Sequence, residues 1–253
     1  MDKNYVEVNG TVLVNLRDDT LSSASQLASG VTGHLRTGEK VTGTGGNMSA
    51  NPLYGKILSV TGDSICAGER YAGGYAGIIA DENDMTVQNI AESGGTIVNT
   101  SGRFNIGGSI SSMRADADYV LLEGGINDST LSVTLGSITN GFYATPDTTT
   151  FAGAFEKMLS DTLNRFPTAK IGYIFVHKTN VGDFMSTSGA NSYYGIAKAA
   201  CEKWGIPYCD LNTLCPPIPF VNSLLSYSDG VHPTEDGYRI FYVPKITAWM
   251  KTL

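Results

Sequence analysis

Short apolar runs and longer amphipathic segments alternate along the chain from Lys56 onward. The short runs are six to eight residues long and mostly apolar, which is typical of strands buried on both faces. Between them, apolar residues recur at helical spacing; Phe151, Phe155 and Met158, for example, share one face. The predicted strands cover residues 56–61, 85–90, 118–124, 170–177 and 206–211. The predicted helices cover residues 73–83, 151–166 and 190–204, followed by a helix that begins near Thr234 and is interrupted at Pro244.

This alternation predicts an α/β fold in which helices cover both faces of a parallel sheet. Parallel strands need crossover connections, and the helical segments between the apolar runs are long enough to provide them. The expected architecture is therefore a three-layer α/β/α sandwich with a five-stranded parallel sheet.

Residues 1–51 differ in composition from the rest of the chain. They are rich in Gly, Thr, Ser and Asn, contain alternating runs such as VEVNGTVLVNL, and show no helical period. The stretch VTGTGGNMSANP near their end is typical of a flexible linker. We therefore predict two parts, a small β-rich or extended N-terminal module with its linker over residues 1–51 and an α/β domain over residues 52–253.

Polar residues follow four of the five predicted strands. Ser64 follows the first strand, Gly94 the second and Asn127 the third, while Asp229 and His232 come after the fifth strand and a Pro-rich loop. Because ligands of open parallel sheets bind beyond the carboxyl ends of the strands, we expect these residues to meet at one edge of the sheet.

The residue types at this edge suit acyl transfer. A serine hydroxyl becomes a useful nucleophile when a histidine removes its proton, and a carboxylate fixes the tautomer of that histidine. Backbone N–H groups and a side-chain amide can stabilise the oxyanion that forms. The alternatives are structural: Ser64 as a turn or helix-cap residue, Gly94 as part of a tight turn and Asn127 as a cap.

Four blocks in this order resemble the SGNH (GDSL) hydrolase family. They are GDSI at 62–65, NIAESGGT at 89–96, GIND at 125–128 and DGVHP at 229–233. The resemblance covers residues 56 to about 250. It implies a flavodoxin-like sheet and the hydrolysis of esters, thioesters or sugar acetyl groups.

The resemblance also implies a role for each block. Ser64 would be the nucleophile, and Asp229 and His232 would complete a catalytic triad with it. The N–H groups of Ser64 and Gly94 and the amide of Asn127 would form the oxyanion hole.

One position departs from the family pattern. The glycine block has Ala91 where a Gly is common, which leaves Gly94 or Gly95 as the oxyanion donor, and we prefer Gly94.

Two further residues are candidates for substrate binding. His177 ends the fourth predicted strand at the same edge, and Tyr71 follows the nucleophile block. Each has a structural alternative, since a histidine without a nearby acid and an aromatic residue at helical spacing are commonly core residues.

Composition and charge limit the classes of molecule that the protein is expected to bind. The net charge of −7 and the pI near 4.9 argue against nucleic acid and anionic membranes, and no apolar run is long enough to span a bilayer. The start, MDKNYVEVNG, lacks the apolar core of a signal peptide, so we expect synthesis in the cytoplasm. The four cysteines have no CxxC spacing and the three histidines are scattered, so we expect free buried thiols, no metal site and no cofactor.

The segment over residues 9–44 is similar to short modules of phage tail and baseplate proteins. The similarity implies a particle-associated or prophage esterase that contacts structural partners through residues 1–51. It leaves the oligomeric state undefined.

The loops around the predicted site favour a small acyl group. Residues 65–77 are small and Gly-rich, and no long apolar lid is present, so we expect an O-acetyl esterase acting on carbohydrate. The Ser/Thr-rich insert over residues 129–150 is expected to shape the leaving-group side. The rival functions are a lipase or thioesterase for longer acyl chains and a non-enzymatic glycan-binding tail component.

Overall fold

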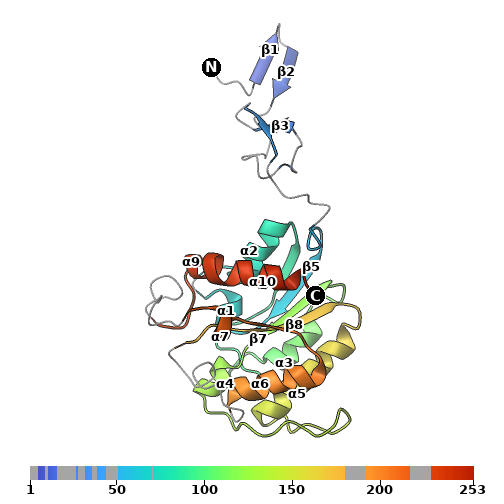
Figure 1. Ribbon diagram of the computed structural model, residues 1–253, viewed down its shortest axis with the longest axis vertical. Helices are drawn as coiled ribbons and strands as arrows, with labels where there is room; N and C mark the ends of the chain where they lie inside the picture. Colours follow the sequence, from blue (N-terminus) through green and yellow to red (C-terminus); the bar gives the residue numbers. More distant parts are fainter. Residues whose placement is uncertain are drawn as a thin grey trace. The chain divides into compact units, whose positions relative to one another are not determined.

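The chain divides into two compact units, Met1–Tyr54 and Gly55–Leu253 (Figure 1). Most of the linker predicted before residue 52 lies outside the described residues, as does the start of the helix predicted from residue 190. The structure, a computed structural model, describes residues 5–8, 11–15, 27, 32–35, 39–43, 51–69, 71–179, 192–216 and 229–253.

The described part of the first unit consists of two β-hairpins. Strand β1 (Tyr5–Val8) pairs antiparallel with β2 (Thr11–Asn15), and β3 (Thr32–His34) pairs antiparallel with β4 (Lys40–Thr42). The β-rich content expected of this segment is confirmed. Its resemblance to phage tail modules stays a prediction.

The second unit is built on a five-stranded parallel sheet with the strand order β6-β5-β7-β8-β9. In chain order this is 2-1-3-4-5, the flavodoxin-like arrangement in which the connections reverse direction at the first strand. The predicted fold class is confirmed, and each strand lies within its predicted range. The strands are β5 (Ile57–Thr61), β6 (Thr86–Asn89), β7 (Tyr119–Glu123), β8 (Lys170–Phe175) and β9 (Tyr208–Asp210).

Helices cover both faces of this sheet (Figure 1). On one face lie α2 (Gly74–Asn83) and α10 (Val243–Met250), and on the other lie α3 (Ile106–Ser109), α5 (Phe151–Arg165) and α6 (Tyr193–Trp204). The predicted three-layer sandwich is therefore present. Shorter helical segments are α1 (Ser64–Ala67), η3 (Ile110–Ser112), α4 (Ile126–Thr130), α7 (Leu211–Leu214) and α9 (Glu235–Gly237).

Helix α5 shows how the sequence pattern becomes packing. Its side chains at Phe151, Phe155 and Met158 are buried, as the helical spacing predicts, and each such burial is worth about 1.5–3 kcal/mol. On the opposite face, α10 lies close to the sheet because Gly172 of β8 has no side chain. A Cβ there would meet the ring of Trp249 at 2.2 Å.

The C-terminal helix differs from its prediction. Helical structure does not break at Pro244 but continues from α9 through a π-helical turn, η4 (Tyr238–Tyr242), into α10. The N–H of Val243 donates to the carbonyl of Tyr238, five residues earlier. Pro244 then occupies the first turn of α10, where its missing N–H costs little.

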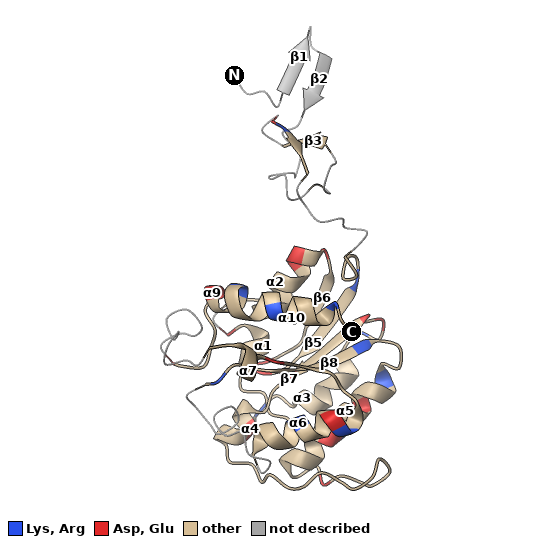
Figure 2. Ribbon diagram, in the orientation of Figure 1, with Lys and Arg blue, Asp and Glu red and all other residues tan. Residues whose placement is uncertain are grey.

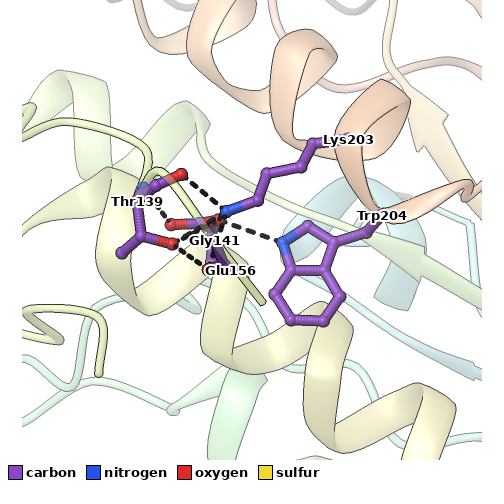
Figure 3. Close-up of polar contacts among 5 residues, drawn as sticks. All are labelled: Thr139, Gly141, Glu156, Lys203 and Trp204. Carbon is purple, nitrogen blue, oxygen red and sulfur yellow. Dashed lines mark hydrogen bonds and ion pairs between the residues drawn. The ribbon is translucent and has the colours of Figure 1, made fainter. Parts of the chain in front are cut away.

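The insert over residues 129–150 is fastened to the outer helices (Figure 3). Glu156 of α5 is fully buried and accepts hydrogen bonds from the Thr139 N–H at 2.8 Å and the Trp204 Nε1–H at 3.0 Å, and Lys203 Nζ lies 2.5 Å from it. Lys203 Nζ also donates to the Thr139 carbonyl at 2.7 Å. The middle of the insert thus packs on α5 and α6. Its expected role in shaping the leaving-group side stays a prediction.

The strands of the sheet carry few charged residues (Figure 2). Lys170 begins β8 and is exposed, Asp210 ends β9 and is half-buried, and Glu123 ends β7 and is fully buried. All four cysteines are buried free thiols, as expected. No helix within the described residues is both long and apolar enough to cross a membrane.

Candidate active site

Ser64 lies directly beyond the carboxyl end of β5, at the first position of α1. Asp63 caps this helix by accepting a hydrogen bond from the Ile65 N–H at 3.0 Å. The Cys66 N–H donates to Glu123 at 3.2 Å, whereas the Ser64 N–H has no acceptor among the described residues. The turn therefore presents both the hydroxyl and a free N–H at the edge of the sheet.

His232 reaches this hydroxyl from near the C-terminal end of the chain. Its Nε2 lies 2.8 Å from Ser64 Oγ, although the two residues are 168 positions apart in the sequence. Its Nδ1 lies 2.9 Å from Asp229 Oδ2. The structure thus brings Ser64, His232 and Asp229 into one hydrogen-bonded line.

Asp229 is held in a tight turn by the backbone that follows it. Its Oδ1 accepts hydrogen bonds from the N–H groups of Val231 at 2.9 Å and His232 at 3.0 Å. Partial burial by itself raises the pKa of Asp229, but these bonds and the one from the His232 ring outweigh it and lower the pKa to about 2. The carboxylate is therefore ionised at neutral pH and orients the ring through its Nδ1.

Gly94 and Asn127 approach the same edge from neighbouring loops. Asn127 Nδ2 donates to the Gly95 carbonyl at 2.9 Å, which leaves its second N–H for another acceptor. The Gly95 N–H is already donated to the Glu92 carbonyl, at 3.1 Å. The N–H of Gly94, a residue with φ of +76°, has no acceptor in the described part of the chain. Arg103 Nη1 lies 3.4 Å from the Gly94 carbonyl oxygen.

Asp128 is a buried residue of the site that sequence reasoning gave no role. It is fully buried, and its two oxygens accept hydrogen bonds from the N–H groups of Ile97 and Val98, each at 2.9 Å. It thereby ties the loop after β6 to α4. Its place directly after Asn127, inside an otherwise buried segment, was the available signal.

Glu123 is a second missed residue. Its Oε2 accepts hydrogen bonds from the N–H groups of Asp63 and Cys66, both at 3.2 Å, directly below the Ser64 turn. A Cβ at Gly62 would lie 2.6 Å from this oxygen, so the contact requires a glycine there. An acidic residue at the end of an apolar strand was the sequence signal.

His177 lies in the core beyond β8. The side chain is fully buried, and its Nδ1 lies 2.5 Å from the Tyr242 hydroxyl. Burial, together with the charge of His232, lowers the pKa of His177 to about 3, so the ring is neutral. This setting matches the core alternative for His177, because a fully buried ring presents no surface to a substrate.

Tyr71 lies beside α1 and is half-buried. Its hydroxyl accepts a hydrogen bond from Arg239 Nη2 at 3.2 Å, and the guanidinium carbon lies 6.0 Å from the ring centre. The ring is therefore held on the C-terminal helix. Its role in binding substrate stays a prediction.

Comparison with known proteins places this geometry in a family. The model of the GDSL-like lipase/acylhydrolase family matches residues 60–240. A search of curated proteins found no match.

Solved structures share the fold at low sequence identity. A protein from Lactobacillus plantarum has a TM-score of 0.66 and 24% identity, with 79% of this chain and 98% of that chain covered. A protein described as a GDSL-like lipase, from Bacteroides ovatus, has a TM-score of 0.59 and 18% identity, with 79% and 100% covered. The lipase/acylhydrolase from Enterococcus faecalis has a TM-score of 0.51 and 18% identity, with 78% and 96% covered.

The family match spans all four blocks and both ends of the hydrogen-bonded line from Ser64 to Asp229. The chain therefore belongs to the GDSL-like lipase/acylhydrolase family and is an ester-hydrolysing enzyme.

Proposed function

We propose that this enzyme removes short acyl groups, acetyl foremost, from carbohydrate esters through an acyl-serine intermediate. In this proposal Ser64 is the nucleophile, His232 the general base and Asp229 the residue that orients the base. The observation that carries it is the continuous line of hydrogen bonds, 2.8 Å from Ser64 Oγ to His232 Nε2 and 2.9 Å from His232 Nδ1 to Asp229 Oδ2.

The reaction follows from that line. Ser64 Oγ attacks the ester carbonyl carbon while its proton passes to His232 Nε2, and a tetrahedral oxyanion forms. His232 then gives the proton to the leaving alcohol oxygen as the carbon–oxygen bond breaks, which leaves the acyl group on Ser64. Water attacks the acyl-serine with His232 again as base, and the acid and free serine are released.

Three donors are proposed for the oxyanion. The Ser64 N–H has no acceptor among the described residues, whereas the next two N–H groups of α1 donate to carboxylates. Gly94 is preferred to Gly95 because the N–H of Gly95 is already donated to a carbonyl. Asn127 adds its second amide N–H. Such preorganised donors commonly contribute the largest share of the rate enhancement.

The fold of the segment after the nucleophile supports the proposal that the acyl group is small. This segment folds back on itself: the Tyr71 N–H donates to the Gly68 carbonyl at 3.0 Å, and the Gly74 N–H donates to the Tyr71 carbonyl at 2.9 Å. A segment folded in this way does not extend over the site as an apolar lid for a fatty chain.

A hydroxyl-rich leaving group is supported by the polar residues beside Gly94. The Ser93 hydroxyl is hydrogen-bonded to the exposed Glu69 carboxylate, and Arg103 is exposed next to the same loop. These residues offer both donors and acceptors to sugar hydroxyls.

The decisive experiment measures acetate release from a panel of acetylated sugars and polysaccharides, with Ser64→Ala as the inactive control. We expect release from at least one acetylated glycan. A p-nitrophenyl ester series is run in parallel, and its rates should fall as the acyl chain lengthens. Faster turnover of long chains would reject the acetyl-ester proposal in favour of a lipase.

A further inference from the structure

Two buried carboxyl groups meet directly below Ser64. Glu123 is 0% exposed and Asp63 is 1% exposed. One oxygen of each is occupied, since Glu123 Oε2 accepts the N–H groups of Asp63 and Cys66 and Asp63 Oδ1 accepts the N–H of Ile65. The other two oxygens, Asp63 Oδ2 and Glu123 Oε1, receive no hydrogen bond from any described donor.

The groups around this pair supply almost no positive charge. Its titratable neighbours on the surrounding elements are thiols, phenols and another carboxyl group, and the imidazole of His232 faces Asp63. These neighbours are Cys66 of α1, Tyr75 of α2, Asp128 of α4, Tyr173 of β8 and Tyr242 of η4. Among the described residues, no lysine or arginine offsets two negative charges at this pair.

A proton on one of the two groups resolves both problems. Two buried anions would repel each other, and neither could donate a hydrogen bond to the other. A protonated carboxyl group is a donor. Burial raises the pKa of Glu123 well above its usual range and that of Asp63 to about 6, so Glu123 is the group that keeps the proton.

We propose that Glu123 and Asp63 hold one proton between them at neutral pH, donated from Glu123 Oε1 to Asp63 Oδ2, and that this pair is the positioning device for Ser64. The pair fixes the backbone N–H groups of Asp63, Ile65 and Cys66, which flank the nucleophile on both sides. The positioning role toward Ser64 rests on the function proposed above, whereas the shared proton does not.

The shared proton makes the Ser64 turn sensitive to alkaline pH. Loss of the shared proton leaves two adjacent anions under the turn, and their repulsion moves the Ser64 hydroxyl away from His232. The pair therefore sets an alkaline limit on the reaction.

The first test compares two variants by their rate of labelling with a fluorophosphonate. Glu123→Gln keeps both roles, because its amide oxygen accepts the two N–H groups and its NH₂ donates to Asp63. Its labelling rate at neutral pH should be within a few-fold of that of the wild type. Unlike the wild type, it should show no fall in labelling rate at alkaline pH. Glu123→Leu keeps similar bulk without the hydrogen bonds and should label about 10²-fold more slowly, the usual effect of misplacing a reactive group by 1 Å. If the labelling rates of the wild type and Glu123→Gln fell equally at alkaline pH, the proposal would be overturned.

The second test needs no activity. The infrared spectrum of the wild type at neutral pH should contain the carbonyl stretch of a buried protonated carboxylic acid, which Glu123→Gln lacks. Glu156→Gln is the matched control, because Glu156 is equally buried but paired with Lys203, and it should leave this band unchanged. Absence of the band from the wild type would overturn the shared proton.

The two tests separate the two proposals. If the band is present but the wild type does not react with the fluorophosphonate, the proposed function fails and the shared proton stands. If the wild type reacts but has no band, the shared proton fails and the proposed function stands.

Discussion

Two glutamates of this enzyme are equally buried and have opposite electrostatic settings. Glu123 lies under the Ser64 turn beside a second carboxyl group, whereas Glu156 lies under the insert and meets the ammonium of Lys203 at 2.5 Å. Burial raises the pKa of Glu123. Burial acts in the same direction on Glu156, but the hydrogen bonds from Lys203, Thr139 and Trp204 outweigh it and lower the pKa.

The difference shows that burial alone does not decide the charge of a carboxyl group. The cation decides it at Glu156, and that ion pair joins α5, α6 and the insert (Figure 3). At Glu123 the described hydrogen-bond donors are backbone N–H groups and the neighbouring group is another acid, which favours a neutral carboxyl group beneath Ser64. One region uses an ion pair to hold a loop, and the other limits two acids beneath Ser64 to a single negative charge.

The sharpest contrast between the two regions is in activity. Ser64→Ala should lower the turnover of p-nitrophenyl acetate by about 10⁴-fold or more, because no other hydroxyl replaces the nucleophile. Its free energy of unfolding should stay within about 0.5 kcal/mol of the wild type, as for a surface substitution. Steady-state kinetics and urea unfolding measure the two quantities. Turnover close to the wild type would refute the role of Ser64.

The oxyanion side of the same region gives the next largest effect. Asn127→Ala should lower kcat by about 10²–10³-fold, with a smaller change in KM, because its amide acts on the charge of the transition state. Asn127→Asp is the matched control. It keeps the size but cannot donate when ionised, so it should be at least as slow. An unchanged kcat in either variant would exclude this role for Asn127.

Glu156 should instead govern stability. Glu156→Ala leaves Lys203, whose side chain is 17% exposed, without its carboxylate and should lower the free energy of unfolding by about 3 kcal/mol. The kcat of the molecules that remain folded should not change. Thermal unfolding and active-site titration separate the two effects. A loss of kcat without a loss of stability would place Glu156 in the active site and contradict its purely structural role.

The pH dependence of stability should have opposite signs at the two glutamates. A lowered pKa, as at Glu156, stabilises the fold above about pH 4.5, and this stabilisation is lost as acid protonates the folded state. A raised pKa, as at Glu123, has the reverse effect, since the folded state keeps a proton that the unfolded chain releases above about pH 4.5. Its contribution falls as the pH rises, by up to about 1.4 kcal/mol per pH unit.

Urea unfolding at several pH values tests these signs. Relative to the wild type, the free energy of unfolding of Glu123→Gln should rise as the pH rises from about 5 to 8. The free energy of unfolding of Glu156→Gln should lie below that of the wild type, and this difference should be smallest at acid pH. If stability relative to the wild type changed with pH in the same direction in both variants, the two glutamates would not have opposite electrostatic settings.

The smallest effect concerns the loop beside Gly94. Arg103 donates a long hydrogen bond, 3.4 Å, to the Gly94 carbonyl, and Arg103 is exposed. Arg103→Ala should lower kcat/KM for acetylated sugars by about 2–10-fold, the range expected of one exposed charged hydrogen bond. Arg103→Lys should restore part of it. A larger loss than that of Asn127→Ala would mean that Arg103 acts directly on the reacting group.

Much of this architecture was predictable from the sequence. The central strands were predictable because apolar runs such as residues 118–124 are buried on both faces, whereas the edge strand β6 is partly exposed. The meeting of Ser64 with His232 follows from parallel strands that end at one edge.

What sequence reasoning missed depends on distant contacts. The partners of Glu123 and Glu156 lie outside the elements that carry these glutamates, 17 to 60 positions away, and no local pattern specifies them. The π turn before Pro244 was missed because a proline inside a helical pattern ordinarily predicts a break, whereas the widened turn lets the helix continue past it.

The length of chain between Ser64 and His232 also orders the events of synthesis. Ser64 is synthesised before His232, so a chain that ends between them carries the hydroxyl without the imidazole. His232, the proposed base, lies just before the helical segment that covers one face of the sheet over Gly172. The contact between Ser64 and His232 can thus form only after the chain that follows the fifth strand has been added.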